Sequence, residues 1–268
     1  PTLVLLHGIT SSGAGWVDAV RRWAGSYRVA AFDALGHGLS DRFTDDELAG
    51  EGAEAGAGAI EALVTTTIVA LDEIVGGSDT VVLYGHSMGG AMASAVAARR
   101  PDLLRGLLLE DPAWKAESLE TQASRAAAWL ETAREFCNDP ERAIAETLAD
   151  PDLTWPRDEI PPWVHARTQL DERFIAIGRP EMREPWRELV DALRVPTLLV
   201  TGTDDVIVGG DMRREVARIN PQVRVAVIEG AGHSTRRDRS DEFHALADPW
   251  IAERFADACA QRQLRTFR

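Results

Sequence analysis

The chain has 268 residues, of which 45% are hydrophobic and 27% charged, and it carries a formal net charge of −14. These proportions are typical of a globular protein with one large α/β domain, or with one domain and an insertion. The acidic excess argues against a nucleic-acid partner, which needs a basic face, and against binding to an anionic membrane surface.

Short apolar runs alternate along the chain with stretches of helical length. The runs lack strict alternation of polar and apolar residues, which is typical of strands covered by helices on both faces of a parallel sheet. The predicted strands are Leu3–Leu6, Tyr27–Phe32, Thr80–Tyr84, Leu103–Leu109, Val195–Val200 and Val223–Ile228. The predicted helices between them are Trp16–Trp23, Ile60–Val75, Met88–Arg99, Asp211–Arg218 and Asp241–Gln263. This alternation predicts an α/β fold with a doubly wound, mostly parallel sheet.

The alternation stops once, between about residues 112 and 190. This segment has helical patterns only, as in Ser118–Asn138 and Glu141–Leu148, and holds five of the eight tryptophans. We interpret residues 112–190 as a helical cap, or lid, inserted in a core formed by residues 1–111 and 191–268.

The strongest local motif is Gly85-His86-Ser87-Met88-Gly89, between a predicted strand and a helix rich in small residues. In this strand–turn–helix context G-x-S-x-G forms a sharp turn that holds the serine hydroxyl clear of the sheet. Ser87 is therefore the candidate nucleophile. His86 is expected to be a packing residue.

A serine hydroxyl needs a base, and the base needs a carboxylate that fixes its tautomer. His233 follows the last predicted strand within Gly230-Ala231-Gly232-His233, a loop position from which a side chain can reach Ser87. The acid should follow another strand end. Asp204 and Asp205 come after one strand, and Glu110-Asp111 closes another, so the residues alone leave the choice open.

The chain resembles the α/β-hydrolase superfamily, and four stretches carry the resemblance. They are His7-Gly8-Ile9, Asp33-Ala34-Leu35-Gly36-His37-Gly38-Leu39-Ser40, the turn at Ser87, and Gly202–Asp205 together with Gly230–His233. The resemblance implies the triad Ser87, Asp205 and His233, since the acid in this superfamily usually lies three residues after the glycine of a G-x-x-D turn. A minority of members take the acid from the preceding strand end, where Asp111 stands.

The resemblance also implies an oxyanion hole formed by the backbone N–H groups of Ile9 and Met88. His7 and Asp33 are expected to organise the neighbouring loops. By the same resemblance, Leu3–Leu6 matches the third strand of the superfamily's sheet, so an initial hairpin is expected upstream of Pro1. No cofactor and no metal site are implied.

Three residues are predicted to bind substrate. Trp114, nearest to a strand end, is the best candidate for an aromatic roof over Ser87. Arg236 and Arg237 follow His233 closely, and one of them could meet a carboxylate on the substrate.

We therefore expect a serine hydrolase that cleaves a carboxylic ester with a bulky or aromatic apolar group, with a half-ester such as a monoalkyl phthalate as one form. The alternatives are a C–C bond hydrolase of ring-cleavage products, a thioesterase or lactonase, and a slow-turnover ligand receptor. Most of the negative charge lies in the cap and in residues 41–61, which predicts an acidic rim that favours neutral or weakly charged esters.

The compartment and assembly are predicted from simpler features. Two cysteines, Cys137 and Cys259, cannot build a disulfide framework and fit a reducing compartment. No apolar stretch reaches the length of a membrane-spanning helix. We expect a cytoplasmic monomer or homodimer.

Overall fold

A parallel β-sheet forms the centre of the molecule. The computed structural model describes residues 1–49, 57–76, 80–115, 118–178, 182 and 184–265, with side chains as far as residue 256. In these residues the sheet has six strands in the order β2-β1-β3-β4-β5-β6, and every neighbouring pair is parallel. The strands are β1 (Thr2–Leu6), β2 (Arg28–Ala31), β3 (Val81–His86), β4 (Leu104–Glu110), β5 (Thr197–Gly202) and β6 (Val223–Ile228). All six lie on the predicted runs, and the predicted fold class is confirmed.

The strand order places a crevice at the carboxyl ends of β1 and β3. The chain steps from β1 outward to β2, then returns to β3 on the other side of β1 and continues outward to β6. Connections therefore leave these two neighbouring strands in opposite directions, and ligands of open α/β sheets bind at such a switch point.

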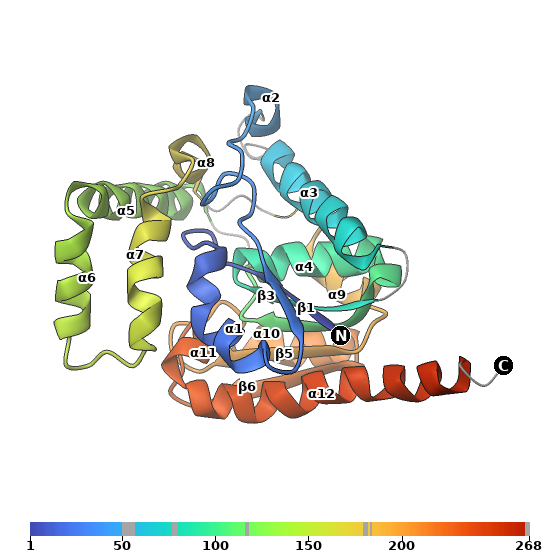
Figure 1. Cartoon of the computed structure of the whole chain (residues 1–268). Coiled ribbons are helices and arrows are strands. Elements are labelled where there is room, and N and C mark those ends of the chain that lie inside the picture. Colours follow the sequence, from blue (N-terminus) through green and yellow to red (C-terminus); the bar gives the residue numbers. More distant parts are fainter. Residues whose placement is uncertain (50–56, 77–79, 116–117, 179–181, 183, 266–268) are drawn as a thin grey trace.

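Helices cover both faces of the sheet because the strands are apolar on both faces. In β3, Leu83 packs into one buried cluster, and Val82 and Tyr84 pack into the other. One face is covered by α1 (Val17–Trp23) and α12 (Ser240–Arg265), and the other by α3 (Ala57–Val75), α4 (Met88–Arg99) and α10 (Gly210–Ile219). Two layers of helices thus enclose the sheet (Figure 1).

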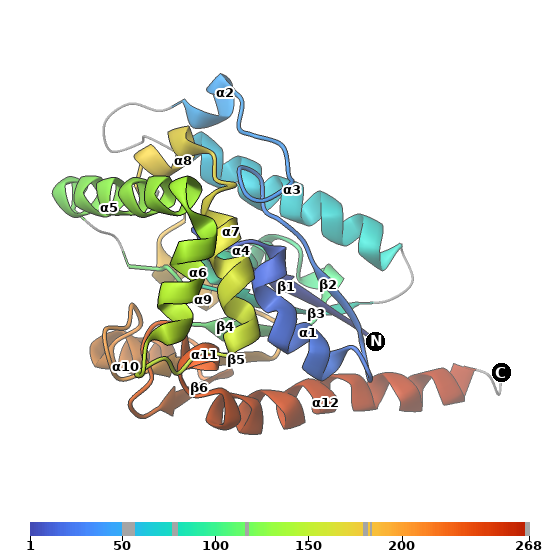
Figure 2. The ribbon, with the colours of Figure 1, turned by 60° about the vertical axis from the view of Figure 1, so that its left-hand side comes forward.

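The segment between β4 and β5 is helical wherever it is described, as the sequence predicts. Its helices are α5 (Leu119–Asn138), α6 (Pro140–Ala149), α7 (Ile160–Arg167), α8 (Glu172–Ala176) and α9 (Trp186–Ala192). Helices α5 to α8 form one group beside the sheet, seen in both ribbon views (Figures 1 and 2), whereas α9 packs against α4 and α10. The domain division at residues 112 and 190 stays a prediction.

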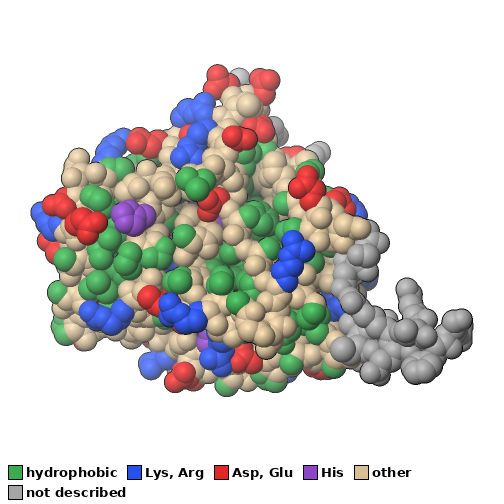
Figure 3. Space-filling model, in the orientation of Figure 1, with side chains coloured by type: hydrophobic (Ala, Val, Ile, Leu, Met, Phe, Trp, Pro, Cys, Tyr) green, Lys and Arg blue, Asp and Glu red, His purple; other side chains and the backbone are tan. Residues whose placement is uncertain are grey.

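The surface carries its acidic side chains unevenly. On the face shown in Figure 3 they gather over α2 (Asp45–Leu48), whose first turn contains three acidic residues. Part of the acidic segment 41–61 lies outside the described residues. No helix among the described residues has both the length and the apolar character needed to span a membrane.

Candidate active site

Ser87 occupies a strained turn that only this local sequence permits. Its backbone has φ 55° and ψ −116°, between β3 and the first turn of α4. A Cβ atom on Gly85 would lie 2.2 Å from the carbonyl oxygen of Gly89, and one on Gly89 would lie 2.2 Å from that of Leu6. The two glycines therefore let the turn pack against its own helix and against β1, which leaves the serine at the crevice.

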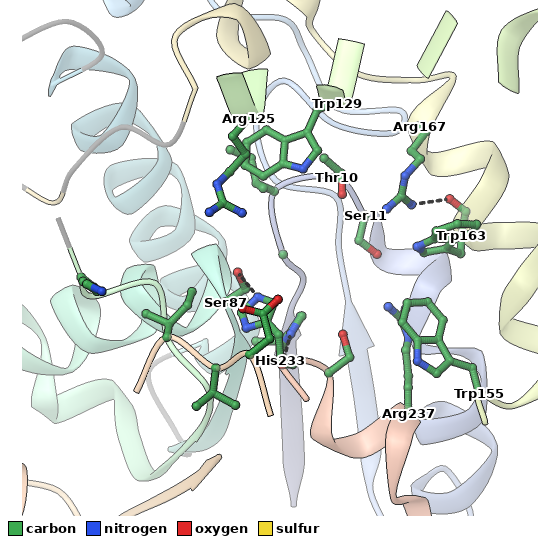
Figure 4. Close-up of a pocket in the computed structure, with 18 residues that line it drawn as sticks. Thr10, Ser11, Ser87, Arg125, Trp129, Trp155, Trp163, Arg167, His233 and Arg237 are labelled. Atoms are coloured by element: carbon green, nitrogen blue, oxygen red, sulfur yellow. Dashed lines mark hydrogen bonds between the residues drawn. The ribbon is translucent and has the colours of Figure 1, made fainter. Parts of the chain in front are cut away.

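His233 connects Ser87 to a buried carboxylate. Its Nε2 lies 2.9 Å from Ser87 Oγ, and its Nδ1 lies 2.5 Å from Asp111 Oδ2 (Figure 4). The Nε2–H group of His86 donates to the carbonyl oxygen of His233 at 3.0 Å, and the two rings pack with their centroids 4.8 Å apart. Burial, followed by the effects of His233 and Arg237, holds the pKa of His86 well below its ordinary value. As expected, His86 packs away from the serine hydroxyl.

Asp111 is the carboxylate that meets His233. It follows β4 directly, is fully buried, and accepts three further hydrogen bonds at 2.9 Å, from the Thr201 hydroxyl and the N–H groups of Ile207 and Val208. Burial acts to raise the pKa of Asp111, but the hydrogen bonds from His233, Ile207 and Val208 outweigh it and hold the pKa below its ordinary value. The carboxylate is therefore kept charged behind the imidazole ring.

The prediction that Asp205 occupies this position is wrong. Asp205 is exposed, has φ 48°, and makes no hydrogen bond that involves the described residues. Asp204 is also exposed and accepts from the Thr203 hydroxyl. In the loop after β5, the N–H groups of Ile207 and Val208 donate to the Asp111 carboxylate. The Asp205 side chain lies in the lining of the pocket that contains Ser87 and His233, and makes no hydrogen bond with His233.

Of the two predicted oxyanion residues, Met88 follows Ser87 directly at the start of α4, and Ile9 lines the pocket that contains Ser87. In the described part of the chain neither the Ile9 N–H nor the Met88 N–H has an acceptor, and their role as an oxyanion hole stays a prediction. The Ile9 carbonyl is held by His37 Nε2–H at 2.6 Å. This contact fixes the loop after β1.

His7 and Asp33 organise the loops around the crevice, as predicted. His7 Nε2 accepts from the Ala34 N–H at 3.0 Å, so its Nδ1 carries the proton and donates to the Gly8 carbonyl at 2.8 Å. Burial, aided by His37, lowers the pKa of His7 to about 3. The Asp33 carboxylate accepts from the N–H groups of Gly13 and Leu39.

A pocket of about 430 Å³ opens over Ser87 and His233. The cap contributes three indole rings to its lining, those of Trp129, Trp155 and Trp163. Among the described residues, the basic side chains in the lining are Lys115, Arg125, Arg167 and Arg237, and the one carboxylate is that of Asp205. Within the described part of the chain, the sign of this charge is opposite to that predicted for the rim, because the lining has four basic side chains and one carboxylate.

Two of the predicted substrate-binding residues do not reach this pocket. Trp114 is 5% exposed, stacks on Trp186, and donates from Nε1 to the Ser94 hydroxyl, so it belongs to the core. Arg236 is 2% exposed and forms a bidentate ion pair with the fully buried Glu159. Both predictions are wrong because proximity in sequence to a strand end or to His233 does not set side-chain direction.

Arg237 does line the pocket, and its cationic neighbours in the cap, Arg125 and Arg167, were not predicted from the sequence. Arg125 and Trp129 stand four residues apart on α5, and Trp163 and Arg167 stand four residues apart on α7. Residues at this spacing share one face of a helix. The repeated spacing of an arginine and a tryptophan on two cap helices was the sequence feature from which these lining residues could have been predicted.

Comparison with known proteins gives consistent matches across the chain. Residues 3–246 match the model of the alpha/beta hydrolase family. N-formylmaleamate deformylase of Pseudomonas putida is 27% identical over 248 residues, which cover 91% of this chain and 85% of that protein. The 2-(acetamidomethylene)succinate hydrolase of Mesorhizobium japonicum is also 27% identical over 248 residues, with coverage of 87% and 81%. The solved enol-lactonase of Burkholderia xenovorans LB400 has a TM-score of 0.68 at 22% identity, covering 94% of this chain and 91% of that one.

Proposed function

The chain belongs to the alpha/beta hydrolase family, and from this premise we propose that it hydrolyses a carboxylic ester through an acyl-enzyme formed on Ser87. The observation that carries the proposal is the continuous chain of contacts from Ser87 Oγ through His233 to Asp111. A serine activated in this way attacks carbonyl carbon.

The reaction follows from the roles that these groups can take. His233 Nε2 accepts the Ser87 proton while Oγ attacks the ester carbonyl, and Asp111 holds Nδ1–H and stabilises the imidazolium. The Ile9 and Met88 N–H groups bind the oxyanion. His233 then gives the proton to the departing alcohol, which leaves the acyl group on Ser87. A water molecule, deprotonated by His233, releases the acid and restores the serine.

The pocket supports a substrate with a bulky or aromatic group. Its volume of about 430 Å³ exceeds the needs of an acetyl group, and the indoles of Trp129, Trp155 and Trp163 offer flat apolar contact area. A half-ester of a dicarboxylic acid, such as a monoalkyl phthalate, would combine such a group with a negative charge.

A second candidate is hydrolysis of an amide-type bond in a small carboxylate-bearing compound. Two relatives are named for N-formylmaleamate and for 2-(acetamidomethylene)succinate, both of which carry carboxylates. The basic side chains around the pocket favour the same class of substrate. The same triad serves both bonds, since each reaction passes through a tetrahedral oxyanion. No specific observation favours the C–C bond hydrolase, the thioesterase or lactonase, or the receptor.

The test is a panel of 4-nitrophenyl esters of varied acyl size, with matched 4-nitroanilides, for the unmodified chain and for Ser87→Ala. We expect a burst of nitrophenol equal to the enzyme concentration, then steady turnover, and loss of both in Ser87→Ala. A burst without turnover would identify a slow receptor. Full activity in Ser87→Ala would overturn the mechanism.

A further inference from the structure

The pocket over Ser87 is basic although the chain as a whole is strongly acidic. Of its four basic side chains, Arg167 and Arg237 lie together at the end lined by Trp155 and Trp163, across the pocket from Arg125 (Figure 4). Asp205, which supplies the one carboxylate that the described residues place in the lining, is exposed to solvent. A pocket lined by positive charge attracts anionic ligands, even in a protein that is acidic overall.

Arg167 has no carboxylate partner among the described residues. Its one hydrogen bond within them runs from Nη1 to the Trp163 carbonyl at 3.0 Å, and its guanidinium lies 4.0 Å from the centroid of the Trp163 ring. Burial, followed by the repulsion of Arg237, lowers the pKa of Arg167 to about 9. The side chain is therefore charged at neutral pH, partly removed from water, and close to a like charge, an arrangement that an anion would stabilise.

Two contacts hold the Arg237 guanidinium in place near Arg167, and one of its nitrogens has no acceptor among the described residues. Nε donates to Glu159 at 2.6 Å, Nη2 donates to the Gly15 carbonyl at 3.1 Å, and the group lies 4.7 Å from the Trp155 ring centroid. Nη1 makes no hydrogen bond within the described residues. Glu159 is shared with Arg236, which also faces the Asp18 carboxylate at 3.8 Å, so Arg167, Arg236 and Arg237 outnumber these two carboxylates. Positive charge is left over at this end of the pocket.

Polar side chains lie between the serine and this arginine pair. Thr10 and Ser11, from the loop after β1, lie between the Ser87–His233 pair and Arg167, and their side chains line the pocket (Figure 4). One molecule can therefore place its reacting carbonyl at Ser87 and a second functional group at the arginines. Two fixed guanidinium groups match a carboxylate, which accepts paired N–H donors.

We propose that Arg167 and Arg237 form a carboxylate-binding subsite, and that the substrate is a half-ester or half-amide of a dicarboxylic acid whose free carboxylate binds there. This inference rests on the proposed function of Ser87. Either Arg236 or Arg237 was predicted from the sequence to bind a substrate carboxylate. The structure favours Arg237 and Arg167 of α7 for this role, because the Arg236 guanidinium is paired with the Glu159 carboxylate.

The first test compares two esters of similar size that differ in charge, each rate being corrected for uncatalysed hydrolysis, which the neighbouring carboxylate accelerates in the anionic ester. Mono-4-nitrophenyl succinate carries a carboxylate where 4-nitrophenyl 4-oxopentanoate carries a methyl ketone, and both release the same phenol. We expect Arg167→Gln to lower kcat/KM for the anionic ester by about 10²-fold, mainly through KM, and to lower that for the neutral ester at least about tenfold less. Arg167→Lys should recover part of the loss. Arg134→Gln, on exposed α5 surface away from the pocket, is the matched control and should change neither.

The second test measures binding without turnover. Succinate is titrated calorimetrically into Ser87→Ala and into Ser87→Ala/Arg167→Gln, and we expect affinity in the first that falls by at least tenfold in the second. Equal effects of Arg167→Gln on both esters, or equal succinate affinity in both proteins, would overturn the subsite. If ester hydrolysis proves independent of Ser87 while succinate binding still depends on Arg167, the proposed function fails and the subsite stands.

Discussion

Replacing Asp111 by asparagine removes the charge behind His233 with almost no change in side-chain volume. The carboxylate accepts four hydrogen bonds, two on each oxygen: Thr201 and Val208 donate to Oδ1, and Ile207 and His233 donate to Oδ2. An amide has one accepting oxygen, so asparagine can accept the hydrogen bonds of only one of these two pairs of donors.

The asparagine has two orientations, and both impair catalysis. With its oxygen toward His233, the tautomer is kept but the imidazolium loses its counter-charge, and the Val208 N–H is left without an acceptor. With its NH₂ toward His233, the ring must present an unprotonated Nδ1, which leaves Nε2 unable to accept the Ser87 proton. Loss of the charge in a Ser–His–Asp triad costs about 10⁴-fold in kcat, or about 5 kcal/mol of transition-state stabilisation.

The assay is the steady-state rate with a 4-nitrophenyl ester, with urea unfolding as the check on folding. We expect Asp111→Asn to lose about 10³- to 10⁴-fold in kcat and about 1–3 kcal/mol of stability from the stranded donor. Asp205→Asn is the matched control, because Asp205 is exposed and forms no hydrogen bond with the described residues, and its rate should stay within about twofold. A large loss in Asp205→Asn together with a small loss in Asp111→Asn would refute the reasoning.

Three further predictions concern the framework of the site. Gly89→Ala places a Cβ 2.2 Å from a main-chain oxygen of β1, so we expect loss of esterase activity and a lower Tm, whereas Gly25→Ala, with open space around it, should leave both unchanged. Glu159→Gln leaves two buried arginines poorly paired and should cost about 3–5 kcal/mol in urea unfolding; a cost no greater than that of the exposed control Glu146→Gln would contradict the anchoring role. His7 has its pKa lowered from 6.5 to about 3, so between these pH values the unfolded chain binds a proton that the folded chain does not. Stability should therefore fall by up to about 5 kcal/mol as the pH is lowered through this window, and should fall less steeply in His7→Gln; parallel pH profiles would speak against a neutral, buried His7.

The order of strands and helices was readable from the sequence because it depends on local patterns. Runs such as Val81-Val82-Leu83-Tyr84 are apolar on both faces and bounded by turn residues, and each predicted run became a strand within one or two residues at most ends. The turn at Ser87 was readable because G-x-S-x-G is a local motif. Gly85 is required by its close approach to the Gly89 backbone, and Gly89 by its close approach to Leu6 of the neighbouring strand β1.

Which carboxylate contacts His233 depended on tertiary structure. Asp111 and Asp205 both follow strands of the same sheet, and β4 and β5 are neighbours, so either carboxylate begins near His233. The loop after β5 decides between them, because its N–H groups at Ile207 and Val208 bind the Asp111 carboxylate and the Asp205 side chain is left in solvent.

The pocket lining was decided in the same way. The sequence contains an arginine pair after His233 and a tryptophan-rich cap, but which of these side chains meet in space depends on how the cap helices pack on the core. Glu159, in the cap, takes Arg236 out of the pocket, and α7 brings Arg167 in. Side-chain identity and helical face are properties of the sequence, whereas the pairing of charges across 70 or more residues is fixed by the folded packing, which selects the arrangement with the fewest buried unpaired groups.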